Sequence, residues 1–355
     1  MNIVLDNIIY ELQSYGGISV FWYDLTKMIM KRYPAQTRFI DNPNALNPYR
    51  KSLSIPDNSI IRRNRLVRLS RGLPVKVNSS EPFIFHSSYY RYCSNPKAIN
   101  ITTVHDFTNE FFRQGWKKHL HTWQKRNAIV HSEAIVCVSN STKNDLLHFF
   151  PDIDERKIHV IHNGVSDEYY VLDKEEHVDL PFPSGSFVLF VGSRAAYKNF
   201  QLLGRCIMKT PYNLLIIGQE LSEKEREDLE RNVSPNRFKS LGFISTAELN
   251  VLYNHAAALV YPSNYEGFGL PIIEAQLAGC PVIATNISSI PEVIGNRSLL
   301  MDAPTEDALL AKMKLLEDEG LVAKVRKDGL SHAAGFNIAN MQDKYISLYN
   351  QLLKS

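Results

Sequence analysis

The feature of this chain that most restricts its fold is an alternation of short apolar runs with longer amphipathic stretches, in two series. Runs rich in Val, Ile, Leu and Phe occupy 2–6, 38–41, 83–88, 101–106, 134–139 and 158–164, and then 187–192, 213–218, 238–243, 257–263, 281–285 and 298–302. Stretches with helical spacing separate them, among them 18–31, 116–131 and 142–149. Strands that alternate with helices predict βαβ units and parallel sheets. We therefore predict an α/β protein with two Rossmann-like domains.

A polar segment between the two series marks the expected domain boundary. The stretch at 166–186 combines acidic residues with two prolines and a Gly-Ser end, which is typical of a linker. At 355 residues the chain also exceeds the usual size of one hydrophobic core. We predict an N-terminal domain over 1–168, a linker over 169–186, a C-terminal domain over 187–335 and a closing helix over 336–355. Within the first domain, Asn140 or Ser141 is expected to cap the helix that follows.

Composition excludes several classes of protein. Hydrophobic residues make up 44%, charged residues 22%, and the formal net charge is only +3, which does not indicate a nucleic-acid binder. The four cysteines lie far apart without a CxxC pair, so neither a zinc site nor a disulfide framework is expected. The N-terminus lacks the basic region of a signal peptide, and no apolar run is long enough to span a membrane. We expect a cytoplasmic protein, with attachment to a membrane surface left open.

Ligands of open parallel sheets bind at the carboxyl ends of the strands, so residues that follow strands are the first candidates. Gly16 and Gly17, in YGGIS, follow the first strand and open a helix, where backbone N–H groups can approach an anion. A plain glycine turn is the alternative, and the dinucleotide fingerprint GxGxxG is missing. His105 ends a strand in TVHDF and could contact a sugar or carry a proton, although a structural histidine is the simpler interpretation.

A basic pair follows the first strand of the second series. In VGSRAAYKNF, Gly192 ends the strand, and Arg194 and Lys198 follow with a spacing of four. On an opening helix this spacing places both cations on one face, where they could neutralise a diphosphate. The alternative is a solvated basic start of a helix. Because the helix dipole disfavours cations there, the pair favours anion binding.

The stretch NYEGFGLPIIEAQLAGCPV (264–282) carries two glutamates around a glycine-rich turn. It follows a buried strand, and Pro271 marks the first turn of a helix. Gly267 and Gly269 leave the backbone N–H groups of the loop and helix open to a ligand. Glu266 and Glu274 could accept hydrogen bonds from sugar hydroxyls. Acids favoured by the helix dipole are the alternative.

Two further patterns have simpler explanations. The acidic DxD pattern at Asp152 and Asp154 matches metal-using transferases, but it sits where Asp is common as a turn and cap residue, so no metal site is expected. The stretch 50–76 carries eight basic residues and one acid, Asp57. It is either a solvated basic face or a surface for acidic lipid or a pyrophosphate-bearing acceptor.

Together these motifs resemble glycosyltransferase family 4, whose members are retaining enzymes of the GT-B fold. EGFGLPIIE looks like the E-x7-E element of that family, with Glu266 and Glu274 at its ends, and VGSRAAYKN, LGFIS, YGGIS, VHDF and VIHNGV are similar to family segments along nearly the whole chain. One departure is Val20, which stands where many relatives with GGIS have Arg. A contact made by that arginine is therefore not carried over.

The resemblance implies a role for each matching position. Arg194 and Lys198 would bind the donor diphosphate beside Gly192, Glu274 the ribose and Glu266 the transferred sugar. The remaining donor contacts implied by the resemblance would come from Gly16, Gly17, His105, Gly242, Phe243, Gly267, Phe268, Gly269 and Leu270. Of these, Gly242 and Phe243 would meet the base, Gly17 the phosphates and His105 the sugar.

The resemblance also implies the reaction: a hexose passes from a nucleoside diphosphate sugar to a glycan acceptor with retention, without metal or other cofactor. Bacterial polysaccharide and O-antigen mannosyltransferases look most similar at the N-terminus, which favours GDP-mannose and a lipid-linked acceptor. UDP-glucose and UDP-GlcNAc remain alternative donors. A sugar-nucleotide epimerase, a dinucleotide oxidoreductase and a non-catalytic sugar-nucleotide-binding subunit are the rival functions.

Overall fold

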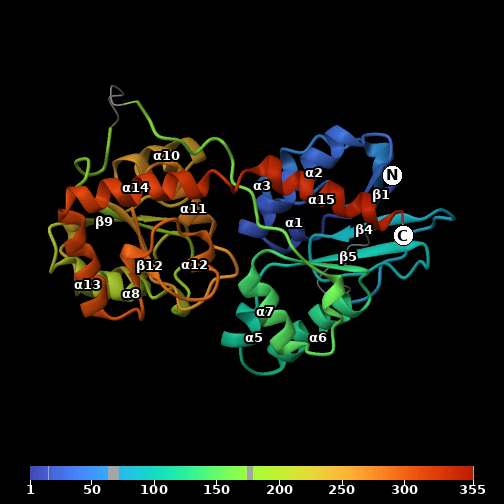
Figure 1. Cartoon of the computed structure of the whole chain (residues 1–355), viewed down its shortest axis with the longest axis horizontal. Helices are drawn as coiled ribbons and strands as arrows, with labels where there is room; N and C mark the ends of the chain where they lie inside the picture. Colours follow the sequence, from blue (N-terminus) through green and yellow to red (C-terminus); the bar gives the residue numbers. More distant parts are fainter. Residues whose placement is uncertain (15, 63–71, 174–178, 355) are drawn as a thin grey trace. The chain divides into compact units, whose positions relative to one another are not determined.

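The chain forms two compact units, each built on its own sheet (Figure 1). The structure is a computed structural model that describes residues 1–14, 16–62, 72–173 and 179–354. Unit 1 comprises Met1–Gly164 and Ile338–Ser355, and unit 2 comprises Val165–Asn337. The predicted α/β class with parallel sheets is confirmed in both units. The expected closing helix falls within unit 1, and the segment 169–186 falls within unit 2.

Unit 1 contains a seven-stranded parallel sheet in the order β3-β2-β1-β4-β5-β6-β7. Its strands are β1 (Ile3–Asp6), β2 (Thr37–Asp41), β3 (Ile60–Arg62), β4 (Phe83–Ser87), β5 (Ala98–Val104), β6 (Ala134–Cys137) and β7 (Ile158–Val160). Its α-helices are α1 (Ile9–Leu12), α2 (Gly17–Arg32), α3 (Pro48–Lys51), α5 (Thr108–Phe112), α6 (Trp116–Val130), α7 (Asn140–Phe149) and α15 (Ile338–Leu352). The chain changes direction across the sheet between β1 and β4, so this is the switch point where open α/β sheets bind ligands.

The C-terminal helix α15 is fastened to the sheet of unit 1 by buried tyrosines. The Tyr349 hydroxyl lies 2.6 Å from His86 Nδ1, and the Tyr345 hydroxyl lies 3.1 Å from Thr103 Oγ1. Both tyrosines belong to the main hydrophobic cluster of the unit, together with Trp22 and Ile84. The apolar residues of the C-terminal helix therefore contribute to the hydrophobic core of unit 1.

Unit 2 contains a six-stranded parallel sheet in the order β10-β9-β8-β11-β12-β13. Its strands are β8 (Phe187–Val191), β9 (Asn213–Ile217), β10 (Phe238–Ser240), β11 (Ala258–Tyr261), β12 (Val282–Thr285) and β13 (Leu300–Met301). Its α-helices are α8 (Phe200–Ile207), α9 (Glu223–Glu230), α10 (Thr246–His255), α11 (Leu270–Leu277), α12 (Ile290–Val293), α13 (Glu306–Lys314) and α14 (Glu319–Ala333). Figure 1 shows helices on both sides of this sheet, which explains why its central strands β8, β11 and β12 are buried apolar runs.

Two local predictions are wrong. Neither Asn140 nor Ser141 caps α7, because Ser139 does so, and its Oγ accepts a hydrogen bond from the Thr142 N–H at 3.0 Å. No α-helix opens at Arg194 either, because a 3₁₀ turn over Ala196–Lys198 precedes α8.

The polar segment 166–173 is attached to unit 2 by hydrogen bonds. The N–H groups of Tyr170 and Leu172 donate to Asn250 and Asn254 of α10, at 3.1 and 2.8 Å.

Candidate active site

The candidate site in unit 2 lies at the switch point of its sheet. Strands β8 and β11 are neighbours, but the chain continues from β8 to β9 on one side and from β11 to β12 on the other. In open α/β sheets, ligands bind in the crevice at the carboxyl ends of two such strands. The predicted residues Gly192, Arg194 and Lys198 follow β8, and Glu266–Leu270 follow β11.

A cation and a carboxylate meet across this crevice. Lys198 Nζ lies 3.0 Å from Glu266 Oε1, and each of the two side chains is only 12% exposed. Lys198 Nζ also donates to the Tyr261 hydroxyl at 3.2 Å. Burial acts to lower the pKa of Lys198, but the Glu266 carboxylate outweighs it, with help from Tyr261 and Tyr197, and raises the pKa well above its ordinary range. The ammonium group is therefore permanently charged and held in place.

Backbone contacts hold the two loops together around this ion pair. Asn199 Nδ2 donates to the Pro262 carbonyl at 2.7 Å, and the Asn264 N–H donates to the Tyr197 carbonyl at 2.7 Å. Asn199 itself adopts a left-handed conformation with φ of 51°, which Asn tolerates better than most residues. The positions of Lys198 and Glu266 are thus fixed by the loops on which they stand.

The glycine-rich loop before α11 is supported by the segment between β12 and α12. The Glu266 N–H donates to Ser288 Oγ, and Ser289 Oγ donates to the carbonyls of Glu266 and Phe268, each at 2.9 Å. Gly267 and Phe268 are buried, and Gly269 precedes α11 with φ of 109°, a conformation that favours glycine. Helix α11 begins at Leu270, and among the described residues no side chain caps it. Its N-terminus is therefore a suitable place for an anion.

Glu274 lies in α11, one turn after Leu270, in a different environment from Glu266. Its Oε2 accepts a hydrogen bond from the Tyr253 hydroxyl at 3.2 Å. Burial raises the pKa of Glu274 from 4.5 to about 7, although hydrogen bonds from Tyr253 and Tyr169 act to lower it. A carboxylate that titrates near neutral pH is more common in functional sites than elsewhere.

Arg194 does not share a face with Lys198, which corrects the sequence-based picture of the basic pair. Its side chain is 4% exposed and pairs with Glu225 of α9, with Nε 2.8 Å from Oε1. Its terminal nitrogens donate to the carbonyls of Gln219 and Glu220 at 2.7 and 2.8 Å, and Nη2 also reaches Glu225 Oε2 at 3.2 Å. These four hydrogen bonds use most of the five N–H donors of a guanidinium. Arg194 thus ties the loop after β8 to the segment after β9.

The other predicted residues of unit 2 also stand at the carboxyl ends of strands. Gly192, directly after β8, has φ of 114°, and its N–H donates to the Ile217 carbonyl at 2.9 Å. Gly242, after β10, has φ of 68°, and its carbonyl accepts from the Gly218 N–H at 2.9 Å. Phe243 is 60% exposed. Its ring is therefore accessible to a planar ligand such as a base.

The predicted residues of unit 1 follow β1 and β5. Helix α2 begins at Gly17 after Gly16, whose backbone is extended, and a Cβ on Gly16 would lie 2.7 Å from Gln13 Oε1. His105 follows β5 and contacts the Phe21 ring edge-on, with centroids 5.1 Å apart. Burial lowers the pKa of His105 to about 4, although Asp106 acts to raise it. The imidazole is therefore neutral at physiological pH and could exchange hydrogen bonds without carrying charge.

The acidic pattern and Arg50 of the basic stretch take structural roles, whereas Lys51, Arg62 and Lys76 are exposed. Asp154 caps the 3₁₀ turn Glu155–Lys157 and binds Arg156, while Asp152 pairs with Arg126. No group of three or more His, Cys, Asp or Glu side chains in the described ranges is arranged to hold a metal. Arg50 is buried and lies 2.6 Å from Asp41, so it is not part of a solvated face. Arg63, Arg65, Arg68 and Arg71 lie outside the described residues.

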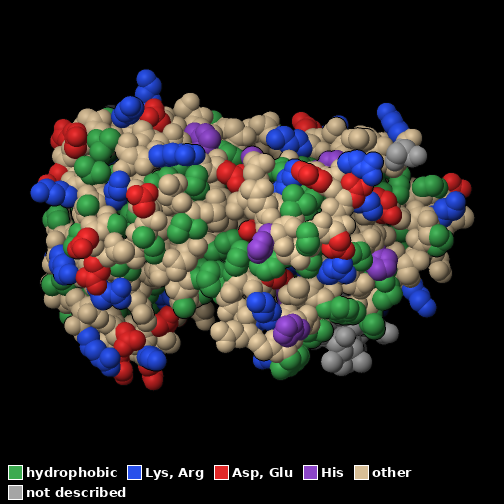
Figure 2. All heavy atoms as spheres, turned by 60° about the horizontal axis from the view of Figure 1, so that its bottom comes forward, with side chains coloured by type: hydrophobic (Ala, Val, Ile, Leu, Met, Phe, Trp, Pro, Cys, Tyr) green, Lys and Arg blue, Asp and Glu red, His purple; other side chains and the backbone are tan. Residues whose placement is uncertain are grey.

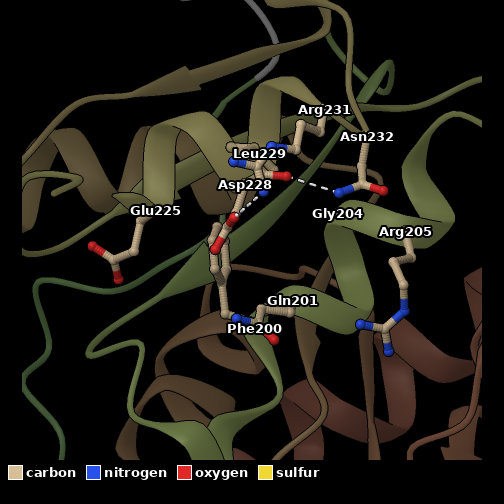
Figure 3. A pocket seen from close by; sticks show the side chains of 9 residues that line it. All are labelled: Phe200, Gln201, Gly204, Arg205, Glu225, Asp228, Leu229, Arg231 and Asn232. Atoms are coloured by element: carbon tan, nitrogen blue, oxygen red, sulfur yellow. Dashed lines mark hydrogen bonds and ion pairs between the residues drawn. The ribbon is translucent and has the colours of Figure 1, made fainter. Parts of the chain in front are cut away.

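A cavity of about 290 Å³ lies near the Arg194–Glu225 pair but is not the candidate site (Figure 3). It opens between α8 and α9, and its lining consists of Phe200, Gln201, Gly204, Arg205, Glu225, Asp228, Leu229, Arg231 and Asn232. Charges of both signs face it, and Asp228 is already bonded to Arg231 and Asn232. None of the predicted site residues is among its lining residues.

The structure adds partners that the sequence did not reveal. Five further residues each contact a predicted site residue: Tyr261, Tyr253, Ser288, Ser289 and Glu225. Tyr261 could have been predicted from the sequence, since it ends β11 and ligands are expected at the carboxyl ends of strands. The remaining four depend on contacts between segments distant in sequence.

None of the described helices is long and apolar enough to cross a bilayer.

Two family models match the chain, one in each half. The model described as Glycosyltransferase Family 4 matches residues 15–169, and the model described as Glycosyl transferases group 1 matches residues 173–331. O-antigen chain mannosyltransferase B of Escherichia coli is 32% identical over 175 residues, which are 47% of this chain and 46% of that protein. O-antigen chain mannosyltransferase RfbU of Salmonella typhimurium is 27% identical over 223 residues, 61% of this chain and 60% of that protein. The chain thus spans about half the length of these relatives.

The fold is also found in a solved structure. The Anabaena protein HepE (Alr3699), crystallised with UDP and glucose, superposes with a TM-score of 0.73 over 99% of this chain and 100% of that chain, at 14% identity. At this identity the likeness concerns the fold, and it confirms the expected GT-B architecture. With its two matched models, its fold and its relatives, the chain belongs to the family 4 glycosyltransferases.

Proposed function

We propose that this protein transfers a hexose from a nucleoside diphosphate sugar to a glycan acceptor, with retention of configuration and without a metal. The observation that carries the proposal is the Lys198–Glu266 pair at the switch point between β8 and β11. A fixed ammonium group beside a helix N-terminus is suited to a diphosphate. A carboxylate next to it is suited to the hydroxyls of the attached sugar.

Each part of the site would hold one part of the donor. Lys198 and the N-terminus of α11 would bind the diphosphate, and Glu266 would orient the sugar. Glu274 would accept hydrogen bonds from the ribose, and Phe243 with Gly242 would meet the base. Arg194 would act indirectly, since its guanidinium already holds the loop that carries Lys198 in register with α9. We retain the roles that the resemblance implies for Gly16, Gly17, Gly192 and His105.

The reaction would break the bond between the anomeric carbon and the diphosphate oxygen and form a bond from that carbon to the acceptor oxygen. Negative charge grows on the leaving diphosphate, and Lys198 with the α11 N–H groups would stabilise it. Attack on the face that the leaving group vacates gives retention. The acceptor proton would pass to an oxygen of the leaving phosphate, so no protein base is required. His105, neutral at physiological pH, would orient hydroxyl groups in this scheme.

GDP-mannose is the favoured donor, and an O-antigen or related lipid-linked polysaccharide is the favoured acceptor. Two relatives support mannose as the sugar and O-antigen as the acceptor, since both are named O-antigen chain mannosyltransferases. UDP-glucose and UDP-GlcNAc are the alternative donors. A non-catalytic subunit that binds sugar nucleotides is the alternative function.

A thermal-shift series tests the proposal directly, because a ligand that binds only the folded state raises the unfolding temperature. We expect GDP and GDP-mannose to raise it more than UDP and UDP-glucose, and Lys198→Ala to abolish the shift. Release of nucleoside diphosphate from the preferred donor, with excess chelator present, then tests catalysis. Binding without any turnover would favour the non-catalytic subunit, and strict dependence on Mn²⁺ would reject the metal-free scheme.

A further inference from the structure

Helix α6 (Trp116–Val130) has an inverted distribution of side chains. The residues on its buried side include His121, Gln124 and Lys125, which are polar. Its exposed side carries Trp116 and Trp123, which are 69% and 53% exposed, and Leu120 and Val130. These four residues recur at helical spacing and form one stripe along the helix. Large apolar side chains gathered on an exposed face of a helix are unusual and indicate an interaction surface.

The buried contacts of α6 explain why the aromatic stripe cannot turn inward. Lys125 Nζ donates to Glu110 Oε2 at 2.7 Å and to the Asp106 carbonyl at 2.8 Å, and it lies 4.0 Å from the centre of the Phe107 ring. His121 adds contacts to Glu110 and to the Tyr89 hydroxyl, at 3.3 and 2.8 Å. Rotating the helix to bury its tryptophans would leave Glu110 buried without its cation, which is strongly unfavourable.

The segment before α6 extends the exposed aromatic surface. Phe111 and Phe112, at the end of α5 (Thr108–Phe112), are 45% and 46% exposed, and every residue from 111 to 117 is exposed. We call the group Phe111, Phe112, Arg113, Trp116, Lys117, Leu120, Trp123 and Val130 the α5–α6 surface. Figure 2 turns this side of unit 1 forward and shows hydrophobic, basic and histidine side chains next to one another.

The charged side chains exposed on this surface are all basic. Residues 111–132 contain Arg113, Lys117, Lys118, Lys125 and Arg126 but no acidic residue. Lys125 is buried with Glu110, Arg126 pairs with Asp152 and Lys118 is half-buried, so Arg113 and Lys117 carry the positive charge of the surface. Lys117 also lies 5.9 Å from the ring of Trp116. Aromatic rings beside lysine and arginine are typical of helices that lie in the interface of an anionic membrane.

We propose that the α5–α6 surface docks unit 1 on an anionic lipid bilayer, with α6 parallel to the membrane plane. Trp116, Leu120 and Trp123 would enter the boundary between headgroups and acyl chains, since indole rings prefer that depth. Arg113 and Lys117 would face the lipid phosphates. This docking would place the enzyme beside a lipid-linked acceptor, but it does not rest on the proposed transfer reaction and can be tested without any donor.

This assignment differs from the one that the basic stretch 50–76 suggested. Arg50 is buried against Asp41, and the described parts of that stretch offer no comparable set of exposed aromatic rings. A basic surface alone binds lipid weakly and loses its affinity as salt rises. The α5–α6 surface combines charge with aromatic side chains, so part of its affinity should survive at high salt.

Binding of the full chain to vesicles tests the proposal. We expect the protein to co-sediment with vesicles of phosphatidylcholine and phosphatidylglycerol and to bind pure phosphatidylcholine at least about tenfold more weakly. Of the three tryptophans in the chain, Trp22 is fully buried, so the emission of Trp116 and Trp123 should dominate any change. Their emission should shift to shorter wavelength when anionic vesicles are added. The double variant Trp116→Gln, Trp123→Gln should lose the binding, again by about tenfold or more.

Matched variants on unit 2 control for general effects of polarity and charge. Met208→Gln with Leu330→Gln removes two exposed apolar side chains elsewhere and should leave vesicle binding unchanged. Arg113→Glu with Lys117→Glu should reduce binding to anionic vesicles, whereas Lys324→Glu with Lys327→Glu on α14 should not. Circular dichroism confirms that each variant is folded before it is compared.

Three results would overturn the proposal. One is that the wild-type chain fails to bind anionic vesicles or binds neutral ones equally well. Another is that the tryptophan variant binds like the wild type. The third is that the tryptophan variant shifts the protein from dimer to monomer while neither form binds vesicles, because the α5–α6 surface would then be an interface between protein chains.

Discussion

Lys198 and Glu266 form an ion pair across the switch point of the C-terminal sheet, with 3.0 Å between Nζ and Oε1. The pair gives the crevice a fixed cation whose charge is balanced before any donor arrives. A donor diphosphate would therefore bind beside a carboxylate, and the two charges of the pair should make opposite contributions to nucleotide binding.

Glu266→Gln should separate catalysis from binding. The substitution removes the negative charge beside Lys198, so affinity for the nucleoside diphosphate should stay equal or rise. Turnover should fall by about a hundredfold, because the sugar loses a charged partner in the transition state. Calorimetry with the diphosphate and initial-rate assays measure the two effects. Lys198→Ala is the matched comparison and should weaken diphosphate binding by about a hundredfold. Loss of nucleotide affinity in Glu266→Gln would contradict these roles.

Arg194→Ala should act through the loop and not by direct loss of a phosphate contact. Its guanidinium is occupied by Glu225 and two backbone carbonyls, so Glu225→Gln should reproduce part of the defect in donor binding. The double variant should be little worse than Arg194→Ala alone, since contacting residues are not additive. Each single variant should lose about 1–3 kcal/mol of unfolding free energy, which urea titration measures. Unchanged donor affinity in Glu225→Gln, beside a large loss in Arg194→Ala, would restore a direct phosphate role for Arg194.

The sequence predicted the strands of both sheets except β3 (Ile60–Arg62), because the strand pattern is local. The runs 187–192 and 257–263 are largely apolar, and both form buried strands within one or two residues of the expected bounds. It also placed Glu266, Lys198 and His105 correctly after their strands. The conformation of Arg194 could not be predicted, because it depends on Glu225, 31 residues further along the chain. The inverted orientation of α6 likewise depends on Glu110, which lies outside the helix.

Lys125→Met should destabilise unit 1 strongly. Burial acts to raise the pKa of Glu110, but His121 and Lys125 overcome this and lower it to about 2, so the carboxylate is ionised. Removing Lys125 leaves this buried charge without its main partner, and we expect a loss of about 3–5 kcal/mol of unfolding free energy. Lys117→Met, on the exposed side of the same helix, should change it by less than about 0.5 kcal/mol.

Adding Glu110→Gln to Lys125→Met provides the internal check. The second substitution removes the unpaired charge, so the double variant should recover part of the stability lost by the single one. Urea unfolding of the three variants measures this. A double variant less stable than Lys125→Met would show that Glu110 stabilises the unit through contacts other than the one with Lys125.

Glu274 should make both stability and nucleotide binding depend on pH around neutrality. Its pKa is raised from 4.5 to about 7, so its contribution to stability is fully present below 4.5 and is lost as pH rises through about 7. The full difference corresponds to about 3 kcal/mol. The ionised carboxylate accepts ribose hydrogen bonds better than the neutral acid, so nucleotide affinity should rise over the pH range in which stability falls.

Glu274→Gln provides the control for this pH dependence, since it keeps the size of the side chain and cannot ionise. We expect the variant to lose the stability change between pH 4.5 and about 7 and to be more stable than the wild type above pH 7. Its nucleotide affinity should be lower than that of the wild type and nearly independent of pH, measured with a sugar nucleotide so that no terminal phosphate titrates. Turnover at saturating donor should change less than in Glu266→Gln, because ribose contacts are made equally in the ground and transition states. A wild-type affinity that does not vary with pH, together with unchanged affinity in Glu274→Gln, would remove Glu274 from the donor site.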